Sequence, residues 1–296
     1  MSIMKQYIHN WDQLSEEDKR KAKEAFKGNP GLNSAVVHPA AKFFEEHRWV
    51  KIDKFVPREM CNLLYHHIEW AAKRLAWKEE NNIPISNDND GTFGDSQAPG
   101  DYSRYGEPIF DTLLNLSLEQ MQTLTGKDLV PTYSYHRLYT VGTELKRHKD
   151  RPSCEISTTV CLGYDNSNVD ASKYPDWDWP MFVKEKDGKE VPVHMKPGDM
   201  IIYRGCEIEH WREPLWGNNH AQVFLHYNEK DGEYNIPYDG RPLLGMSSEF
   251  RSEVSKDKAN ELDKNLDKSK DQNESVVIPF DNDETVKETK IKKVIY

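Results

Sequence analysis

The chain has 296 residues, of which 40 are basic and 50 are acidic, and its formal net charge is -10 at pH 7. An acidic balance of this size argues against wholesale nucleic-acid binding. The sequence contains no run of about 18 apolar residues, which disfavours a membrane span, and it begins without the apolar stretch of a secretory signal. The four cysteines show no CxxC spacing, which excludes a zinc ribbon and indicates buried thiols. We therefore expect a globular protein of the reducing cytoplasm.

The N-terminal part of the chain predicts helices. A thin apolar stripe over residues 12–26 indicates an exposed helix, and we assign residues 1–40 to an N-terminal helical extension. Residues 43–55 are typical of an edge strand that leads into a helix. Apolar side chains recur at helical spacing from Pro57 to Trp77, and proline is favoured at the first position of a helix. This segment predicts a long amphipathic helix.

A polar segment separates this helix from the next one. Residues 79–104 are rich in Asn, Asp, Gly and Ser, which predicts a long loop. Loops of this length are uncommon unless they are functional or disordered, so the segment is a candidate lid. A second helix is expected from Pro108 to Leu124, ended by Gly126.

The character of the chain changes at Val130, where short aromatic or β-branched runs begin. The runs are TYSYHRLYTV, EISTTVCLGY, WPMFV, VPVHM, DMIIYR and AQVFLHYN, and Gly, Pro, Asn and Asp separate them. This spacing predicts an antiparallel sandwich or barrel instead of βαβ units. Because helices precede strands, we expect an α+β protein in which helices buttress one sheet.

Beyond about Leu244 the chain loses its apolar periodicity and fills with Lys, Asp, Glu, Ser and Asn. We expect residues 246–296 to form a polar tail, either flexible or folded as a solvated helix. VVIPF and the terminal VIY are the two apolar segments in it.

Three residues form the most informative motif. His148 and Asp150 form an H-x-D pair that a turn or strand end can present to one metal ion, and His210 offers a third ligand from a distant strand. Two imidazoles and one carboxylate occupy one face of an octahedron and leave positions open, which on Fe(II) suits O2 chemistry. The alternative is a β-sandwich with an HKD turn on its surface and a packed His210.

The surroundings of this motif resemble a known family. YHRLYTVGTELKRHKD, DRPSCEISTTVCLGYD and KPGDMIIYRGCEIEHWRE resemble the Fe(II)/2-oxoglutarate dioxygenases, in particular their prolyl-hydroxylase-like branch. The resemblance implies a double-stranded β-helix, a jelly roll of the cupin type, with its β-core at about residues 130–230. We assign residues 41–245 to this dioxygenase domain.

The resemblance also implies a set of cofactors. His148, Asp150 and His210 would bind Fe(II), 2-oxoglutarate would chelate the ion through its keto oxygen and adjacent carboxylate, and O2 would take the last position. Ascorbate would serve as a reductant. Because Asp150 is retained, the resemblance implies hydroxylation of a C–H bond, since halogenating relatives replace this carboxylate with a small residue.

The distal carboxylate of 2-oxoglutarate needs a cation, and the fork of an arginine matches it best. Members of the family place Lys or Arg roughly ten positions after the distal histidine, where this chain has Asn219 and His220. The available substitutes are His220, Arg137, Arg212 and Arg151. We favour Arg137 together with a charged His220, because Arg137 shares a strand face with Tyr139, which the family motif places in the pocket.

The last strand offers a further set of candidates, since Gln222, Phe224 and His226 alternate along one of its faces. His226 could donate a hydrogen bond near the metal or be a packed core histidine. The substrate is a small metabolite, an amino acid or a peptidyl residue, and the sequence does not choose among them or predict the oligomeric state. Two other functions stay open: a non-catalytic β-sandwich binding module that has lost cosubstrate binding, and a cupin-like metalloenzyme that does not use 2-oxoglutarate.

Overall fold

The computed structural model describes residues 15–17, 20 and 38–258. The helix expected at 12–26 lies mostly outside these residues, and VVIPF and VIY lie wholly outside them. The α-helices that lie wholly within the described part are α3 (Pro39–His47), α4 (Arg58–Glu80), α5 (Asn87–Asp90), α6 (Pro108–Leu116) and α7 (Leu118–Thr125). Three short 3-10 helices are η2 (Pro152–Cys154), η3 (Pro237–Gly240) and η4 (Ser248–Phe250).

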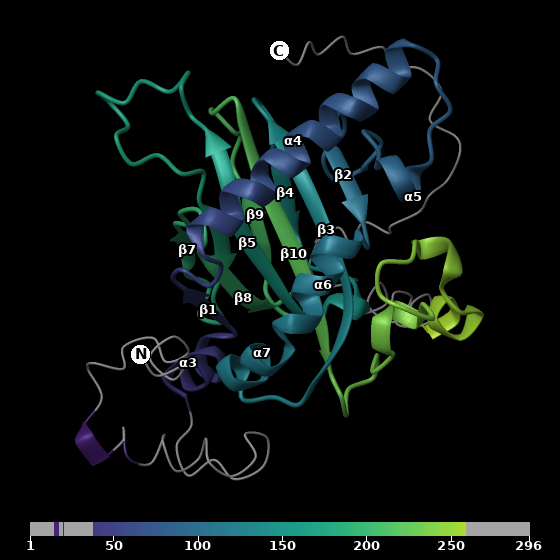
Figure 1. The fold of residues 1–296 in the computed structure, drawn as a ribbon. Coiled ribbons are helices and arrows are strands. Elements are labelled where there is room, and N and C mark those ends of the chain that lie inside the picture. Colours follow the sequence, from purple (N-terminus) through teal and green to yellow (C-terminus); the bar gives the residue numbers. More distant parts are fainter. Residues whose placement is uncertain (1–14, 18–19, 21–37, 259–296) are drawn as a thin grey trace.

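The strands form two antiparallel sheets. The larger sheet has the order β1-β8-β5-β10-β3-β2, and the smaller one has the order β4-β9-β6-β7. Their bounds are β1 Trp49–Ile52, β2 Tyr102–Tyr105, β3 Leu129–Thr140, β4 Leu145–His148, β5 Ile156–Asp165, β6 Met181–Lys184, β7 Glu190–Val193, β8 Met200–Arg204, β9 His210–Arg212 and β10 Asn219–Glu229. Helix α4 crosses one face of the larger sheet (Figure 1). The predicted mixture of helices and antiparallel sheet is confirmed.

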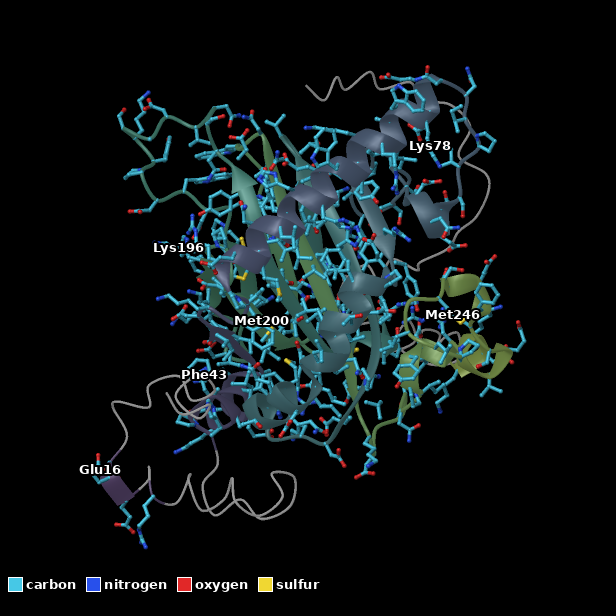
Figure 2. The ribbon with its side chains drawn as sticks, viewed as in Figure 1. Glu16, Phe43, Lys78, Lys196, Met200 and Met246 are labelled. Carbon is cyan, nitrogen blue, oxygen red and sulfur yellow. The ribbon has the colours of Figure 1, made fainter. Side chains whose placement is uncertain are left out.

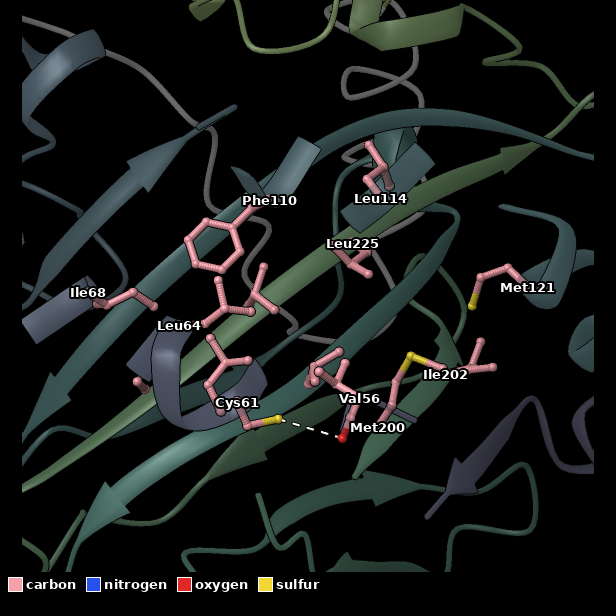
Figure 3. Close-up of a cluster of buried hydrophobic side chains, with 14 of the residues drawn as sticks. Val56, Cys61, Leu64, Ile68, Phe110, Leu114, Met121, Met200, Ile202 and Leu225 are labelled. Atoms are coloured by element: carbon pink, nitrogen blue, oxygen red, sulfur yellow. Dashed lines mark hydrogen bonds between the residues drawn. The ribbon is translucent and has the colours of Figure 1, made fainter. Parts of the chain in front are cut away.

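Helix α4 forms as the sequence predicts, because its apolar side chains recur every three or four residues. Cys61, Leu64 and Ile68 are all buried against the sheet. Figure 2 shows Met200 of β8 in the interior and Lys196 at the periphery of the molecule. Figure 3 shows the α4 side chains beside those of α6, β8 and β10. Each buried aliphatic side chain of this cluster contributes roughly 1.5–3 kcal/mol.

Strand β10 separates this core from the other side of the sheet. Its odd-numbered side chains pack in the core beneath the helices: Ala221, Val223 and Leu225. Its even-numbered side chains line a cavity on the opposite face: Gln222, Phe224 and His226. Successive strand residues point to opposite faces, so the predicted alternation of the last strand is confirmed.

Two boundaries differ from the sequence-based expectation. Phe43 belongs to α3 and not to an edge strand, because Ala41 and Phe44 are buried on one face of that helix. The edge strand itself is confirmed as β1. The helix expected over 108–124 is broken at Ser117 into α6 and α7. The carbonyl of Leu114 near this break accepts a hydrogen bond from the Tyr227 hydroxyl at 2.7 Å, which favours the end of α6 there.

The predicted loop at 79–104 is largely irregular, but it contains α5 and the start of β2. The first part of the predicted polar tail, up to residue 258, contacts the rest of the protein. Ser255 is fully buried, and its Oγ donates to the carbonyl of Asp239 at 2.9 Å. Hydrogen bonds to buried groups therefore attach this segment, although it has no apolar periodicity.

Candidate metal site and cavity

A cavity lies between the two sheets. The empty space inside it, which includes open solvent, measures about 720 Å³. Side chains from β3, β5, β8 and β10 form one wall, and side chains from β4, β6 and β9 form the other. His148, Asp150 and His210 line it together.

The two histidines meet because β4 and β9 are paired antiparallel. His148 and His210 are directly opposite each other in the register, and their ring centroids are 4.3 Å apart. Both side chains are buried. The pairing of two short strands thus brings together residues that are 62 positions apart (210 − 148) in the chain.

The orientation of both rings is fixed by the backbone. His148 Nδ1 lies 2.7 Å from the carbonyl oxygen of Lys146, and His210 Nδ1 lies 2.9 Å from that of Ile208. A carbonyl oxygen can only accept, so Nδ1 carries the proton in both rings. The Nε2 lone pair of each ring is then available for a metal ion, as in metal sites where a second partner holds the imidazole.

Asp150 follows β4 and completes the cluster. Its Oδ1 lies 3.4 Å from Nε2 of His210 and 3.8 Å from Nε2 of His148. Its Oδ2 accepts a hydrogen bond from Ser157 Oγ at 2.7 Å. A Cβ at Gly205 would collide with this carboxylate, so the site requires glycine there. The ligand atoms of the three residues lie within 4.8 Å of one another, close enough to hold one metal ion.

The electrostatics of the cluster suit a divalent cation. Burial, and then the neighbouring His210, lower the pKa of His148 to about 4. Burial opposes ionisation of Asp150, but the electrostatic influence of His210 and then of His148 outweighs it and holds the pKa of Asp150 below its usual range. At neutral pH, His148 is therefore neutral and Asp150 is anionic, which are the forms that bind a metal.

His226 lies behind this cluster. Its Nδ1 is 3.1 Å from Ser157 Oγ, which itself donates to Asp150. Burial lowers the pKa of His226 to about 4. Because the Ser157 hydroxyl gives its proton to Asp150, His226 Nδ1 donates to Ser157 in turn. This chain of hydrogen bonds orients the Asp150 carboxylate.

Arg212, two residues after His210 on β9, lines the same cavity. The side chain is buried, and its Nη1 donates to the carbonyl of Trp179, whereas its Nη2 has no hydrogen-bond partner among the described residues. No carboxylate lies within ion-pair distance of it among the described residues. Burial lowers the pKa of Arg212 to about 10, so the group stays charged at pH 7. Gln222 also lines the cavity, and neither polar atom of its amide has a partner in the described part of the chain.

Arg137, which the sequence favours as the anchor, also lines the cavity. Its Nε donates to Asp95 at 2.6 Å and its Nη2 donates to Gln97 at 2.7 Å. Its Nη1 donates to the hydroxyl of Tyr139 at 3.2 Å. The charge of Arg137 is therefore already balanced by a buried carboxylate. Tyr139 packs against Trp179 and is absent from the cavity lining.

His220 differs from the expectation in both position and charge. It is buried between Tyr164 and Trp179, outside the cavity lining, and its Nε2 lies 3.6 Å from Cys161 Sγ. Burial, and then the charge of Arg212, hold the pKa of His220 well below its ordinary value. These surroundings disfavour a positive charge on His220. Arg212 therefore replaces His220 as a candidate cation for the distal carboxylate of 2-oxoglutarate.

Several residues that line the cavity or support its lining were not identified from the sequence. Asp95 and Gln97 come from the loop considered as a lid, and their composition alone does not distinguish them from other polar loop residues. Tyr133 could have been found, because it alternates with Tyr135 and Arg137 on β3. Ser157 offered no signal, since its role depends on contacts with Asp150 and His226.

No protein-family model matches the sequence, and no curated protein is significantly similar to it. Solved structures resemble its fold. EctD from S. alaskensis, in its apoform, shares 14% identity over 75% of this chain and 85% of its own, with a TM-score of 0.50. A Pseudomonas putida prolyl-4-hydroxylase shares 15% identity over 66% of this chain and 99% of its own, with a TM-score of 0.46. A 2OG-Fe(II) oxygenase family oxidoreductase from Burkholderia pseudomallei shares 15% identity over 66% of this chain and 91% of its own, with a TM-score of 0.43.

The structural neighbours include 2OG-Fe(II) oxygenases and prolyl hydroxylases. The resemblance drawn from the sequence motifs is confirmed at the level of the fold. At these identities the likeness concerns the fold alone. No helix among the described residues combines the length and the apolar character needed to cross a lipid bilayer.

The buried histidines predict a steep dependence of stability on pH. Burial lowers the pKa of His148 and His226 from 6.5 to about 4, and that of His136 to about 3. As the pH falls, the unfolded chain binds protons before the folded protein does. The contribution of each buried histidine to the free energy of unfolding is therefore complete above pH 6.5 and is lost towards pH 4. We expect the metal-free protein to lose about 3 kcal/mol of unfolding free energy per histidine between pH 7 and pH 4.

Urea unfolding at pH 7, 6 and 5 measures this dependence. His136 lies outside the cluster of His148, Asp150 and His210, and neither of its ring nitrogens has a hydrogen bond to the described part of the chain. His136→Leu should therefore flatten the pH dependence without touching the site. Identical slopes for the wild type and His136→Leu would contradict the assignment of His136 as a buried neutral group.

Proposed function

We propose that the protein is an Fe(II)- and 2-oxoglutarate-dependent oxygenase that hydroxylates a C–H bond of a small metabolite, an amino acid or a peptidyl residue. The observation that carries this proposal is the cluster of His148, Asp150 and His210, whose ligand atoms lie within 4.8 Å of one another. Two neutral imidazoles and one carboxylate are the donor set of the non-haem Fe(II) oxygenases. The fixed Nδ1 protons leave both Nε2 atoms for the metal ion.

Arg212 and Gln222 support 2-oxoglutarate as the cosubstrate. A buried guanidinium without a counterion is costly, and a carboxylate delivered by a ligand removes that cost. Arg212 Nη2, which has no partner among the described residues, would donate to the distal carboxylate of 2-oxoglutarate, and the Gln222 amide could donate to it as well. We therefore propose Arg212 as the anchor, with Arg137 in a supporting role because Asp95 occupies its charge.

Fe(II) with 2-oxoglutarate supplies oxidative decarboxylation to succinate and the activation of O2. The residues of this chain would orient the metal ligands and limit the access of water to the site. Ser157 and His226 keep the Asp150 carboxylate turned towards the two histidines. Tyr135 and Phe224 form an apolar wall of the cavity, which limits the access of water.

The strand order also supports a double-stranded β-helix for residues 41–245. In chain order, β3, β5, β8 and β10 belong to the larger sheet, and β4, β6, β7 and β9 belong to the smaller one. A chain that passes between two facing sheets in this way is typical of a jelly roll. The metal cluster then lies at the end of β4 and the start of β9, between the sheets.

Anaerobic titration tests the proposal. Fe(II) and 2-oxoglutarate added together to the wild type should produce a visible charge-transfer band, and His148→Ala should abolish it. His66→Ala, on the exposed face of α4, is the matched control and should keep the band. Absence of the band in the wild type would favour a non-catalytic binding module. A metal-bound protein that consumes O2 without releasing succinate would favour the cupin-like alternative.

A further inference from the structure

Two neighbouring helices expose large apolar side chains. Helices α4 and α6 cover the same face of the larger sheet (Figure 1), and their buried residues belong to one core cluster. On the sides that do not face the sheet, six large apolar residues are between 45% and 75% exposed and form the helical patch: Met60, Leu63, Trp70, Trp77, Ile109 and Leu116. We propose that a second copy of the chain packs against the helical patch, so that the protein forms a two-fold dimer.

The spacing of these residues explains why they are exposed. Leu63, Trp70 and Trp77 recur every seven residues, which is close to two turns of a helix, and Ile109 and Leu116 are separated by the same interval. The residues that α4 and α6 bury against the sheet lie at other positions of each helix. Both helices therefore have a second apolar side, which the described part of the chain does not cover.

The two helices are close enough to present one surface. His67 Nε2 of α4 lies 3.0 Å from Oε1 of Glu107, the residue directly before α6. The rings of His67 and Phe110 are 6.2 Å apart. The outer sides of α4 and α6 therefore adjoin, and a partner of ordinary size can contact both of them at once.

Polar side chains beside the patch already have partners within the chain. His66 Nδ1 lies 2.8 Å from a carboxylate oxygen of Glu69. Lys73 Nζ lies 5.2 Å from the centre of the Trp70 ring, and its aliphatic stem can stay against apolar surface while the ammonium reaches water. The patch therefore offers a partner mainly apolar surface, and contiguous apolar surface of this kind marks interaction sites.

The size of the patch fits a dimer interface. If a large side chain has roughly 200 Å² of surface, the exposed fractions of the six residues amount to roughly 700 Å² per copy. A specific protein–protein interface buries about 800 Å² on each partner. The largest apolar patch of a typical monomer measures about 300–600 Å². The helical patch is thus large for a monomer and sufficient for a stable dimer.

The composition of the patch favours a second copy as the occupant. An interface about a two-fold axis brings the same surface of both copies together. A surface of one charge would then face a like charge, whereas an apolar surface is complementary to itself. Tryptophan and methionine, which the patch contains, are enriched at such interfaces. An anionic lipid surface is a less suitable occupant, because the net charge of the chain is -10.

The patch and the cavity lie on opposite faces of the larger sheet. The odd-numbered side chains Ala221, Val223 and Leu225 of β10 pack beneath the helices, whereas even-numbered side chains of the same strand line the cavity. A dimer that forms through the patch therefore does not cover the cavity of either copy. We expect dimerisation to be independent of metal and cosubstrate binding, so the inference stands apart from the proposed function.

Sedimentation velocity of the full chain, over a dilution series that reaches the micromolar range, tests the inference. The wild type should sediment as a dimer. Leu63→Glu and Trp70→Glu each place a charge within the patch and should raise the dissociation constant of the dimer at least about 10-fold. Leu116→Glu repeats the test on α6. Trp70→Phe keeps an aromatic ring and should stay dimeric.

A matched control separates the patch from a general effect of added charge. Val254 is 73% exposed, close to the 69% of Leu63, and lies in the C-terminal segment outside the patch, so Val254→Glu should leave the dimer intact. The far-ultraviolet circular dichroism of every variant should match that of the wild type, because the substituted side chains are exposed. A wild type that is monomeric over the whole series would overturn the proposal. A dimer that Leu63→Glu and Trp70→Glu both retain, or an equal loss of the dimer in Val254→Glu, would also overturn it.

Discussion

Replacing Arg212 by methionine should raise the dissociation constant for 2-oxoglutarate about 100-fold, or by about 2.7 kcal/mol. Breaking a buried, hydrogen-bonded charge pair costs about 2–5 kcal/mol, because one charge is left without its partner. Arg212 is a buried cavity cation that no described carboxylate reaches, so its loss leaves the distal carboxylate of the cosubstrate in an apolar, buried place. Titration of the charge-transfer band, or of succinate release against cosubstrate concentration, measures the effect.

The same substitution should leave the ligand-free protein as stable as the wild type, or more so. The Arg212 charge is buried against Trp179, and burial lowers its pKa to about 10, which shows that the charge is costly in the absence of a ligand. A destabilised Arg212→Met protein would instead assign the arginine a structural role. Arg137→Met is the informative comparison: it leaves Asp95 buried without its cation and should reduce stability as well as binding.

Replacing Asp111 by alanine should lower the free energy of unfolding by about 3–5 kcal/mol, because a buried guanidinium then loses its counterion. The side chains of Asp111 and Arg241 are fully buried and 2.8 Å apart. The same carboxylate accepts from the Ser134 amide at 3.0 Å and hydroxyl at 2.7 Å, and from the Gly245 amide at 2.7 Å. This residue of α6 therefore joins β3 to the C-terminal segment.

Urea unfolding at pH 7 measures the loss. The double variant Asp111→Leu with Arg241→Met removes both charges and should recover a large part of the stability, although the Ser134 donors stay unsatisfied. Asp170→Ala, at an exposed position, is the control and should change the unfolding free energy by less than about 0.5 kcal/mol. A cost below about 1 kcal/mol for Asp111→Ala would contradict the proposed role of the pair.

Local periodicity accounts for the parts of the fold that could be predicted. The spacing of Cys61, Leu64 and Ile68 predicts α4, and the alternation of Gln222 and Phe224 with apolar residues predicts two unlike faces for β10. Each of these patterns lies within one helix or one strand, so a short segment of sequence is enough to recognise it. The break at Ser117 was missed because a hydroxyl from β10, far along the chain, favours it.

The resemblance of the sequence motifs to a known family was sufficient to group His148, Asp150 and His210, and the pairing of β4 with β9 brings their side chains together in the structure. Their role as metal ligands stays a prediction. The choice among the cations could not be made from the sequence. Arg137 and Arg212 are both arginines on strand faces, and they differ in whether a carboxylate from elsewhere reaches them.

The amino-acid sequence by itself determined the α4 helix, the antiparallel strands and the three residues that the structure gathers into a cluster. Each depends on residue type and on spacing along the chain. The tertiary structure decided which charges are balanced. Asp95 in a loop neutralises Arg137, no described carboxylate reaches Arg212, and Asp239 holds Arg151 from 88 residues away (239 − 151). Electrostatic pairing depends on distances of a few ångströms in space, and these distances cannot be derived from the separation of the residues along the sequence.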